Sequence, residues 1–142
     1  MHERTKKRQQ EIISTRIKRA KILVVDDEPD IALTFKLALE NDGGFDVDIF
    51  YQPHLALTSF EAGVYDIVLL DINMPILNGF QLYTELRKID DKVKICFITA
   101  SVDVGSSDLC IEISRSVNAE CFIRKPIESH ALVIRIKAEL RN

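Results

Sequence analysis

The sequence predicts a single α/β domain built on a doubly wound sheet of five parallel strands, with helices on both faces. Two observations indicate this class. Five short apolar runs alternate with segments whose apolar residues recur at helical spacing, a pattern typical of parallel sheets covered on both sides. Four of the five runs also lead directly into polar residues, which in a parallel sheet would gather at one edge. A length of 142 residues fits one domain.

The expected strands are short, apolar and rich in β-branched residues. The run Ile67–Leu70 is apolar at every position, as expected of a central strand buried on both faces. The segment Phe45–Phe50 instead alternates apolar and acidic residues, which favours an edge position. In chain order we expect strands at Ile22–Val25, Phe45–Phe50, Tyr65–Leu70, Val93–Ile98 and Cys121–Ile123.

Helical patterns fill the intervals between these strands. Ile31, Phe35 and Leu39 lie four residues apart and predict a one-sided helix that ends near Asn41–Gly44. The remaining helices are expected at Pro53–Gly63, at Gln81–Arg87, around Leu109–Val117, and from beyond Pro126 to about Leu140.

The charge of the chain is unevenly distributed. Residues 1–21 hold eight Lys/Arg against two Glu, a net charge of +6, whereas residues 22–142 hold eleven against twenty, a net charge of −9. Residues 1–20 are therefore interpreted as a basic N-terminal extension, flexible or a short helix, ahead of a domain at 21–142. The acidic domain argues against nucleic-acid binding by the folded part, while the extension could contact an acidic partner, nucleic acid or an anionic membrane.

Targeting and redox signals point to a cytoplasmic protein. No apolar run approaches the roughly 20 residues that cross a bilayer, and the basic start has no secretory pattern. The three cysteines, Cys96, Cys110 and Cys121, are odd in number and lack metal-binding spacing, so we expect reduced, structural thiols.

The polar residues at the strand ends form a chemically coherent set: Asp26 and Asp27, Asp71, Thr99 and Lys125. Clustered carboxylates repel one another and call for a hard cation such as Mg²⁺. With such a cation, Asp71 can remain ionised and act as a nucleophile on phosphorus. The ammonium of Lys125 and the hydroxyl of Thr99 would then stabilise the phosphoryl oxygens.

Each member of this set also has a purely structural interpretation. Asp26 and Asp27 could cap the helix that follows Pro29. Thr99 could simply end a strand, and Lys125 could be a surface lysine. It is the combination of all of them at one sheet edge that favours a functional site.

In this order the residues resemble the receiver domain of response regulators in two-component signalling, over about residues 20–142. The resemblance implies a flavodoxin-like fold. It rests on Asp26-Asp27, Asp71 with Met74-Pro75 and Gly79, Thr99-Ala100 and Lys125-Pro126.

The resemblance implies that Asp71 accepts a phosphoryl group from a sensor histidine kinase or a phosphotransfer protein. Asp27, Asp71 and the backbone carbonyl of Asn73 would bind Mg²⁺, and Asp26 would act mostly through water. Thr99 and Lys125 would bind the phosphoryl oxygens.

The family's switch aromatic corresponds to Phe122, three residues before Lys125, although a role for Phe122 in the core is an equally good interpretation. Thr99 and Lys125 are 26 residues apart, which is longer than the family commonly has. The excess lies in residues 101–117, where receivers usually signal, so the geometry of that output face is open.

Only 17 residues follow Lys125, so we expect a stand-alone receiver without an output domain. It would catalyse only its own phosphorylation and dephosphorylation, and would pass the signal of a phosphorelay to an unknown partner protein or through a homodimer.

Two alternatives use the same residues differently. A haloacid-dehalogenase-like phosphatase also has an aspartyl nucleophile, but it needs an acid two residues later, where this chain has Asn73. A pseudo-receiver that serves only as an interaction module would keep the fold without needing the complete set.

Overall fold

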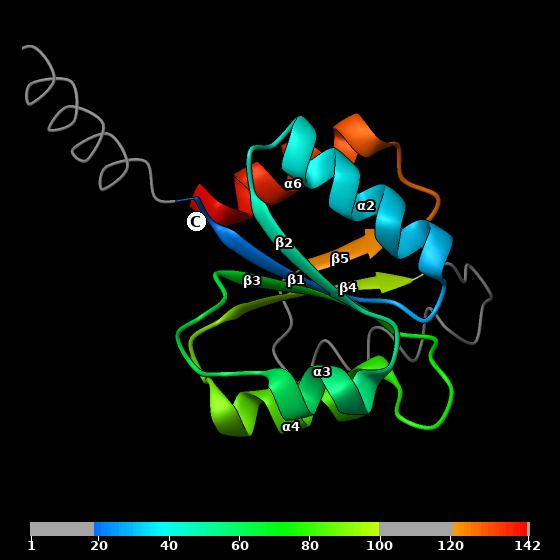
Figure 1. Cartoon of the computed structure of the whole chain (residues 1–142), viewed down its shortest axis with the longest axis vertical. Helices are drawn as coiled ribbons and strands as arrows, with labels where there is room; N and C mark the ends of the chain where they lie inside the picture. Colours follow the sequence, from blue (N-terminus) through cyan, green and yellow to red (C-terminus); the bar gives the residue numbers. More distant parts are fainter. Residues whose placement is uncertain (1–18, 100–120, 142) are drawn as a thin grey trace, which may run out of the picture.

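The computed structural model describes residues 19–99 and 121–141, and in these ranges five strands form one sheet (Figure 1). The strand order is β2-β1-β3-β4-β5, and every neighbouring pair is parallel. This confirms the predicted fold class and places the alternating strand at an edge. The strands are β1 (Lys21–Val25), β2 (Asp46–Phe50), β3 (Ile67–Asp71), β4 (Lys94–Thr99) and β5 (Cys121–Arg124).

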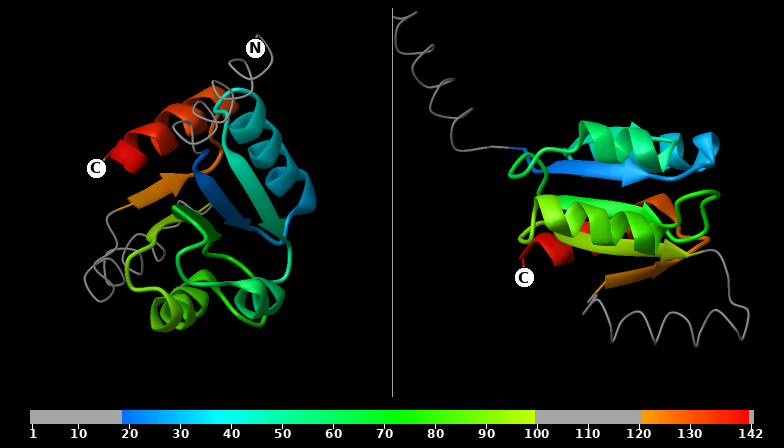
Figure 2. Two further views of the ribbon diagram at one scale, coloured as in Figure 1. Left: turned by 60° about the vertical axis from the view of Figure 1, so that its left-hand side comes forward. Right: turned by 90° about the horizontal axis from the view of Figure 1, so that it is seen from below.

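Helices cover both faces of the sheet, so the fold is doubly wound. α2 and α6 lie on one face, while α3 and α4 lie on the other (Figures 1 and 2). The bounds of these helices are α2 (Pro29–Asn41), α3 (Pro53–Ser59), α4 (Gly79–Ile89) and α6 (Ser129–Arg141).

The strand sequences explain the two cores. Alternate side chains of a strand point to opposite faces, so Ile22 and Val24 pack on the α2/α6 side while Leu23 and Val25 pack on the α3/α4 side. All four are completely buried, each contributing about 1.5–3 kcal/mol by leaving water. β1, an interior strand that is apolar on both faces, thus packs against both helical layers.

The third strand begins and ends later than predicted. We expected it at Tyr65–Leu70, but β3 runs from Ile67 and includes Asp71. Tyr65 instead donates a hydrogen bond from its hydroxyl to an oxygen of Asp48, 2.7 Å away. The sheet also continues past Asp71, because the N–H of Ile72 donates to the carbonyl of Ile98 at 2.9 Å. The backbone is therefore hydrogen-bonded to the sheet both before and after Asp71.

The structure differs from the sequence prediction at two of the cysteines. Cys96 and Cys121 do lie in strands, but they form a disulfide, so the prediction of reduced thiols is wrong for this pair. The sheet register pairs the two residues across β4 and β5, which brings their Cα atoms to 4.6 Å, within the range that a disulfide spans. Cys110 lies outside the described residues.

Two other expectations also lie outside the described residues: the conformation of residues 1–18 and the helix around Leu109–Val117. Within 19–99 and 121–141, none of the helices combines the length and the apolar content that a membrane crossing requires.

Candidate functional site

Asp71 ends β3 at the carboxyl edge of the sheet and is only 2% exposed. Its strand is buried at every position, which leaves the carboxylate facing the loops that follow the strands. One carboxylate oxygen, Oδ1, accepts a hydrogen bond from the backbone N–H of Asn73 at 3.2 Å. The other, Oδ2, lies 3.6 Å from the ammonium of Lys125.

A close approach by α4 shapes the loop after Asp71. Gly79 opens that helix, and a Cβ atom at this position would lie 2.5 Å from the carbonyl oxygen of Asp71. Asn78 caps the helix by accepting hydrogen bonds from the N–H groups of Phe80 and Gln81, both at 3.0 Å. Asn78 and Gly79 thus fold the chain back against the strand end that carries the acid.

The loop after β1 brings further carboxylates to the same edge. Asp26 is 1% exposed, and its Oδ1 accepts a hydrogen bond from the N–H of Glu28 at 2.9 Å. Glu28 is the N-cap residue of α2, and the cap has no side-chain hydrogen bond. The alternative interpretation of Asp26 and Asp27 as helix caps therefore has no support from the capping geometry.

Lys125 joins the two acidic strand ends. It follows β5, its side chain is 6% exposed, and its ammonium lies 2.7 Å from Oδ2 of Asp26. Lys125 is thus not a surface lysine. Its backbone N–H donates to the carbonyl of Thr99 at 2.7 Å, which aligns the ends of β4 and β5.

Thr99 and Phe122 lie on these same two strands. Thr99 ends β4, is 8% exposed and stands opposite Arg124 in the register. Phe122 is half-buried on the α3/α4 side, where its ring stacks on that of Phe97 with centroids 5.5 Å apart. A switching motion of either residue stays a prediction.

Four carboxylates converge at this edge. Asp26, Asp27, Glu28 and Asp71 each offer an oxygen, and these oxygens lie within 4.8 Å of one another. Such a donor set fits a hard divalent cation that prefers oxygen ligands. Glu28 is the member that sequence reasoning missed as a ligand, although its position directly after Asp26-Asp27 was a usable signal.

The electrostatics of the site reflect an excess of carboxylates over cations. Burial raises the pKa of Asp71 from its usual 3.8 to about 7, and the charges of Asp26 and Asp27 act in the same direction. Lys125 and the N–H of Asn73 lower this pKa but do not compensate. A bound divalent cation would supply the missing positive charge.

For Lys125, the neighbouring carboxylates together affect the pKa more than burial does. Burial alone would lower the pKa of Lys125, but the hydrogen bond to Asp26 and the charge of Asp71 raise it above the ordinary lysine value. The ammonium is therefore kept charged inside the site.

Residues 22–137 match the family described as the response regulator receiver domain. The chain is similar to the response regulator ArlR of Staphylococcus saprophyticus, with 33% identity over 121 residues, 85% of this chain and 52% of that protein. It is also similar to the DNA-binding response regulator MtrA of Mycolicibacterium smegmatis, with 35% identity, 87% of this chain and 51% of that protein. The chain thus spans about half the length of these relatives.

Solved structures have the same fold. A CheY-like response regulator receiver domain protein from Methanospirillum hungatei has a TM-score of 0.76 and 27% identity, over 87% of this chain and 95% of the other. The non-phosphorylated HemR receiver domain from Leptospira biflexa has a TM-score of 0.74 and 26% identity, over 87% and 96% of the two chains.

Proposed function

Because the chain belongs to the response-regulator receiver family, a family of phosphorylation-controlled signalling switches, we propose that Asp71 is the residue that accepts the phosphoryl group. One observation supports this choice above the others. Asp71 is a buried carboxylate at a strand end that belongs to the acidic cluster and lies 3.6 Å from the ammonium of Lys125.

The residues around Asp71 can perform the transfer. A carboxylate oxygen of Asp71 attacks the phosphorus of a phosphohistidine, the new O–P bond forms, and the P–N bond breaks. We assign Lys125, whose ammonium lies 3.6 Å from Asp71, the role of neutralising charge on the phosphoryl oxygens, and we assign Thr99 the role of hydrogen-bonding one of them.

The carboxylates are proposed to hold Mg²⁺. Asp27 and Asp71 would bind it together with the backbone carbonyl of Asn73, and Asp26 would act through water. Bound there, the metal would neutralise charge on the phosphoryl group during transfer. Asp27→Ala is expected to abolish measurable Mg²⁺ binding, because it removes one of the clustered oxygen donors.

We assign the partners by chemistry. The phosphoryl donor is a sensor histidine kinase or a phosphotransfer protein, and the downstream target is a protein or a second copy of this chain. We place these events in the cytoplasm and assign the chain no reaction beyond its own phosphorylation and dephosphorylation. The acidic balance of residues 22–142 disfavours nucleic acid as a target of the folded domain. Neither the phosphatase nor the pseudo-receiver alternative is favoured by the family match.

Mass spectrometry tests the proposal directly. Incubation of the full chain with acetyl phosphate and Mg²⁺ should add the mass of one phosphoryl group, and removal of Mg²⁺ should prevent the gain. Asp71→Asn should show no gain, because an amide is not a nucleophile of this kind. A gain that persists in Asp71→Asn, or no gain in the unsubstituted chain, would refute the assignment.

A further inference from the structure

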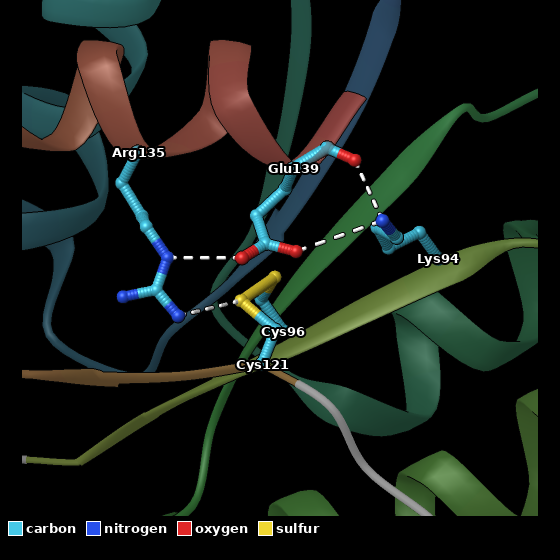
Figure 3. Close-up of a disulfide and its surroundings, with 5 residues drawn as sticks. All are labelled: Lys94, Cys96, Cys121, Arg135 and Glu139. Atoms are coloured by element: carbon cyan, nitrogen blue, oxygen red, sulfur yellow. Dashed lines mark hydrogen bonds and ion pairs between the residues drawn. A yellow bond between two sulfur atoms is a disulfide. The ribbon is translucent and has the colours of Figure 1, made fainter. Parts of the chain in front are cut away.

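The disulfide lies between two strands that carry functional residues. Cys96 and Cys121 pair in register across β4 and β5, and both are buried, at 0% and 1% exposure (Figure 3). Thr99 follows Cys96 by three residues on β4, and Lys125 follows Cys121 by four just beyond β5. The bond therefore lies about 10 Å from the site along the strands.

The disulfide joins β5 to the strand beside it. β5 is an edge strand of the sheet, and its only strand neighbour among the described residues is β4. Two sulfur atoms that are no longer bonded must move apart to van der Waals contact, which shifts the strands or their side chains. Because the N–H of Lys125 donates to the carbonyl of Thr99, a shift of β5 is transmitted to both site residues.

Charged side chains lie beside the pair. A guanidinium nitrogen of Arg135, Nη2, lies 3.7 Å from the sulfur of Cys121 on the side covered by α6 (Figure 3). Arg135 also bonds to Glu139 at 3.0 Å, and Lys94 lies 3.6 Å from the other oxygen of that carboxylate. A carboxylate oxygen of Glu139 lies within 4.8 Å of both sulfurs, and its charge is shared by Arg135 and Lys94. The cation that approaches the sulfur of Cys121 is Arg135, and an adjacent cation stabilises a thiolate.

We propose that Cys96 and Cys121 form a redox-sensitive pair whose oxidation state adjusts the phosphorylation site through β4 and β5. This rests on the proposed function of Asp71. The oxidised pair, as in the structure, holds Lys125 beside Asp26 and Asp71, so oxidation favours phosphorylation and reduction lowers its rate. In the reducing compartment proposed for this chain, an intracellular disulfide would commonly have a catalytic or sensing role.

A peroxide would oxidise the pair to the disulfide, and a dithiol would reduce it again. The thiolate of Cys121 attacks a peroxide oxygen, the O–O bond breaks, and a sulfenic acid and water form after proton uptake. The sulfur of Cys96 then attacks the sulfenic sulfur, releasing a second water and closing the disulfide. In the reverse direction a dithiol reduces the bond, restoring both thiols while the reductant forms its own disulfide.

The thiol cycle can be tested without any phosphorylation. The full chain is treated while folded and then alkylated under denaturing conditions, because both cysteines are buried; intact mass should count three free thiols after dithiothreitol and one after hydrogen peroxide. Arg135→Gln should slow the peroxide step about tenfold by removing the cation beside Cys121, whereas Lys137→Gln, exposed on the same helix, should not. A pair that dithiothreitol cannot reduce, or equal rates in both variants, would overturn the proposed chemistry.

The coupling is tested by comparing the two redox states. The oxidised chain should be phosphorylated by acetyl phosphate about threefold faster or more than the reduced chain, because small displacements of positioning groups cost rate. Cys121→Ser should behave as the reduced chain with or without peroxide.

Mg²⁺ titration of both states separates the two proposals. If neither state is phosphorylated but their Mg²⁺ dissociation constants differ, the proposed function fails and the coupling stands. Equal phosphorylation rates together with equal dissociation constants would overturn the coupling.

Discussion

Lys125 keeps two buried carboxylates compatible with the folded state. Its ammonium contacts Asp26 at 2.7 Å and Asp71 at 3.6 Å, and no other described cation pairs with either acid. Breaking a buried ion pair costs more than the pair itself contributes, because the remaining charge stays desolvated. Lys125→Met should therefore lower the free energy of unfolding by about 3 kcal/mol, measured by urea denaturation in metal-free buffer.

The matched control for this substitution is Lys137→Met. Lys137 is exposed on α6 and has no ion pair among the described contacts, so its loss should change stability by less than about 0.5 kcal/mol. Equal stability of the Lys125 and Lys137 variants would contradict a structural role for the buried pair.

At the residue scale, sequence reasoning located the site but not its internal contacts. It predicted that Asp26, Asp71 and Lys125 would converge, because the ends of parallel strands share an edge. It did not predict that Lys125 would lie closer to Asp26 than to Asp71, or that Glu28 would join the cluster. Those details depend on loop conformations and rotamers that the apolar pattern does not encode.

At the scale of elements, Asp90 connects the end of α4 to two loops. Its Oδ1 accepts hydrogen bonds from the N–H groups of Lys92 and Val93, at 2.9 and 3.1 Å. Its Oδ2 accepts from the N–H of Gly63 at 3.0 Å, in the turn after α3. The hydrogen bonds that these N–H groups donate, that of Gly63 having the largest effect, hold the pKa of Asp90 below its usual 3.8.

This shift predicts how Asp90 contributes to stability as a function of pH. The folded pKa is depressed, so the stabilisation is present above the unfolded value and is lost as pH falls through the folded pKa. Asp90→Asn should lower the free energy of unfolding by about 1–2 kcal/mol at neutral pH, because an amide cannot accept on both sides. Urea denaturation at about pH 7 and about pH 3 should show that difference shrinking in acid.

The neighbouring Asp91 provides the control. It is exposed and accepts none of these hydrogen bonds, so Asp91→Asn should leave both the stability and its pH dependence nearly unchanged. A stability difference for Asp90→Asn that is the same at both pH values would show that the charge of Asp90 does not matter.

Strands were predictable from the sequence to within a residue or two, because continuous apolar runs such as Ile67–Leu70 can only be buried on both faces of a sheet. The pairing of Cys96 with Cys121 was not, since it depends on the register between β4 and β5. Register is set by packing across the whole sheet, so cysteine spacing alone gave the wrong redox state.

At the scale of the whole molecule, the disulfide restricts the unfolded state. It joins residues 25 positions apart and closes a covalent loop that persists when the chain unfolds. Such a loop reduces the conformational entropy of the unfolded state, and for this length the expected stabilisation is about 3.5 kcal/mol. The effect therefore concerns the global free energy of unfolding, in addition to any local adjustment of β5.

Reduction should reveal this contribution in two measurable quantities. The free energy of unfolding should fall by about 3.5 kcal/mol in dithiothreitol, and the urea m-value should rise because the open unfolded chain exposes more surface. Cys110→Ala should respond to the reductant as the unsubstituted chain does, whereas Cys96→Ala should be insensitive to it. If reduction leaves both quantities unchanged, the bond adds nothing to the global fold, and its effect must be confined to the neighbourhood of β4 and β5.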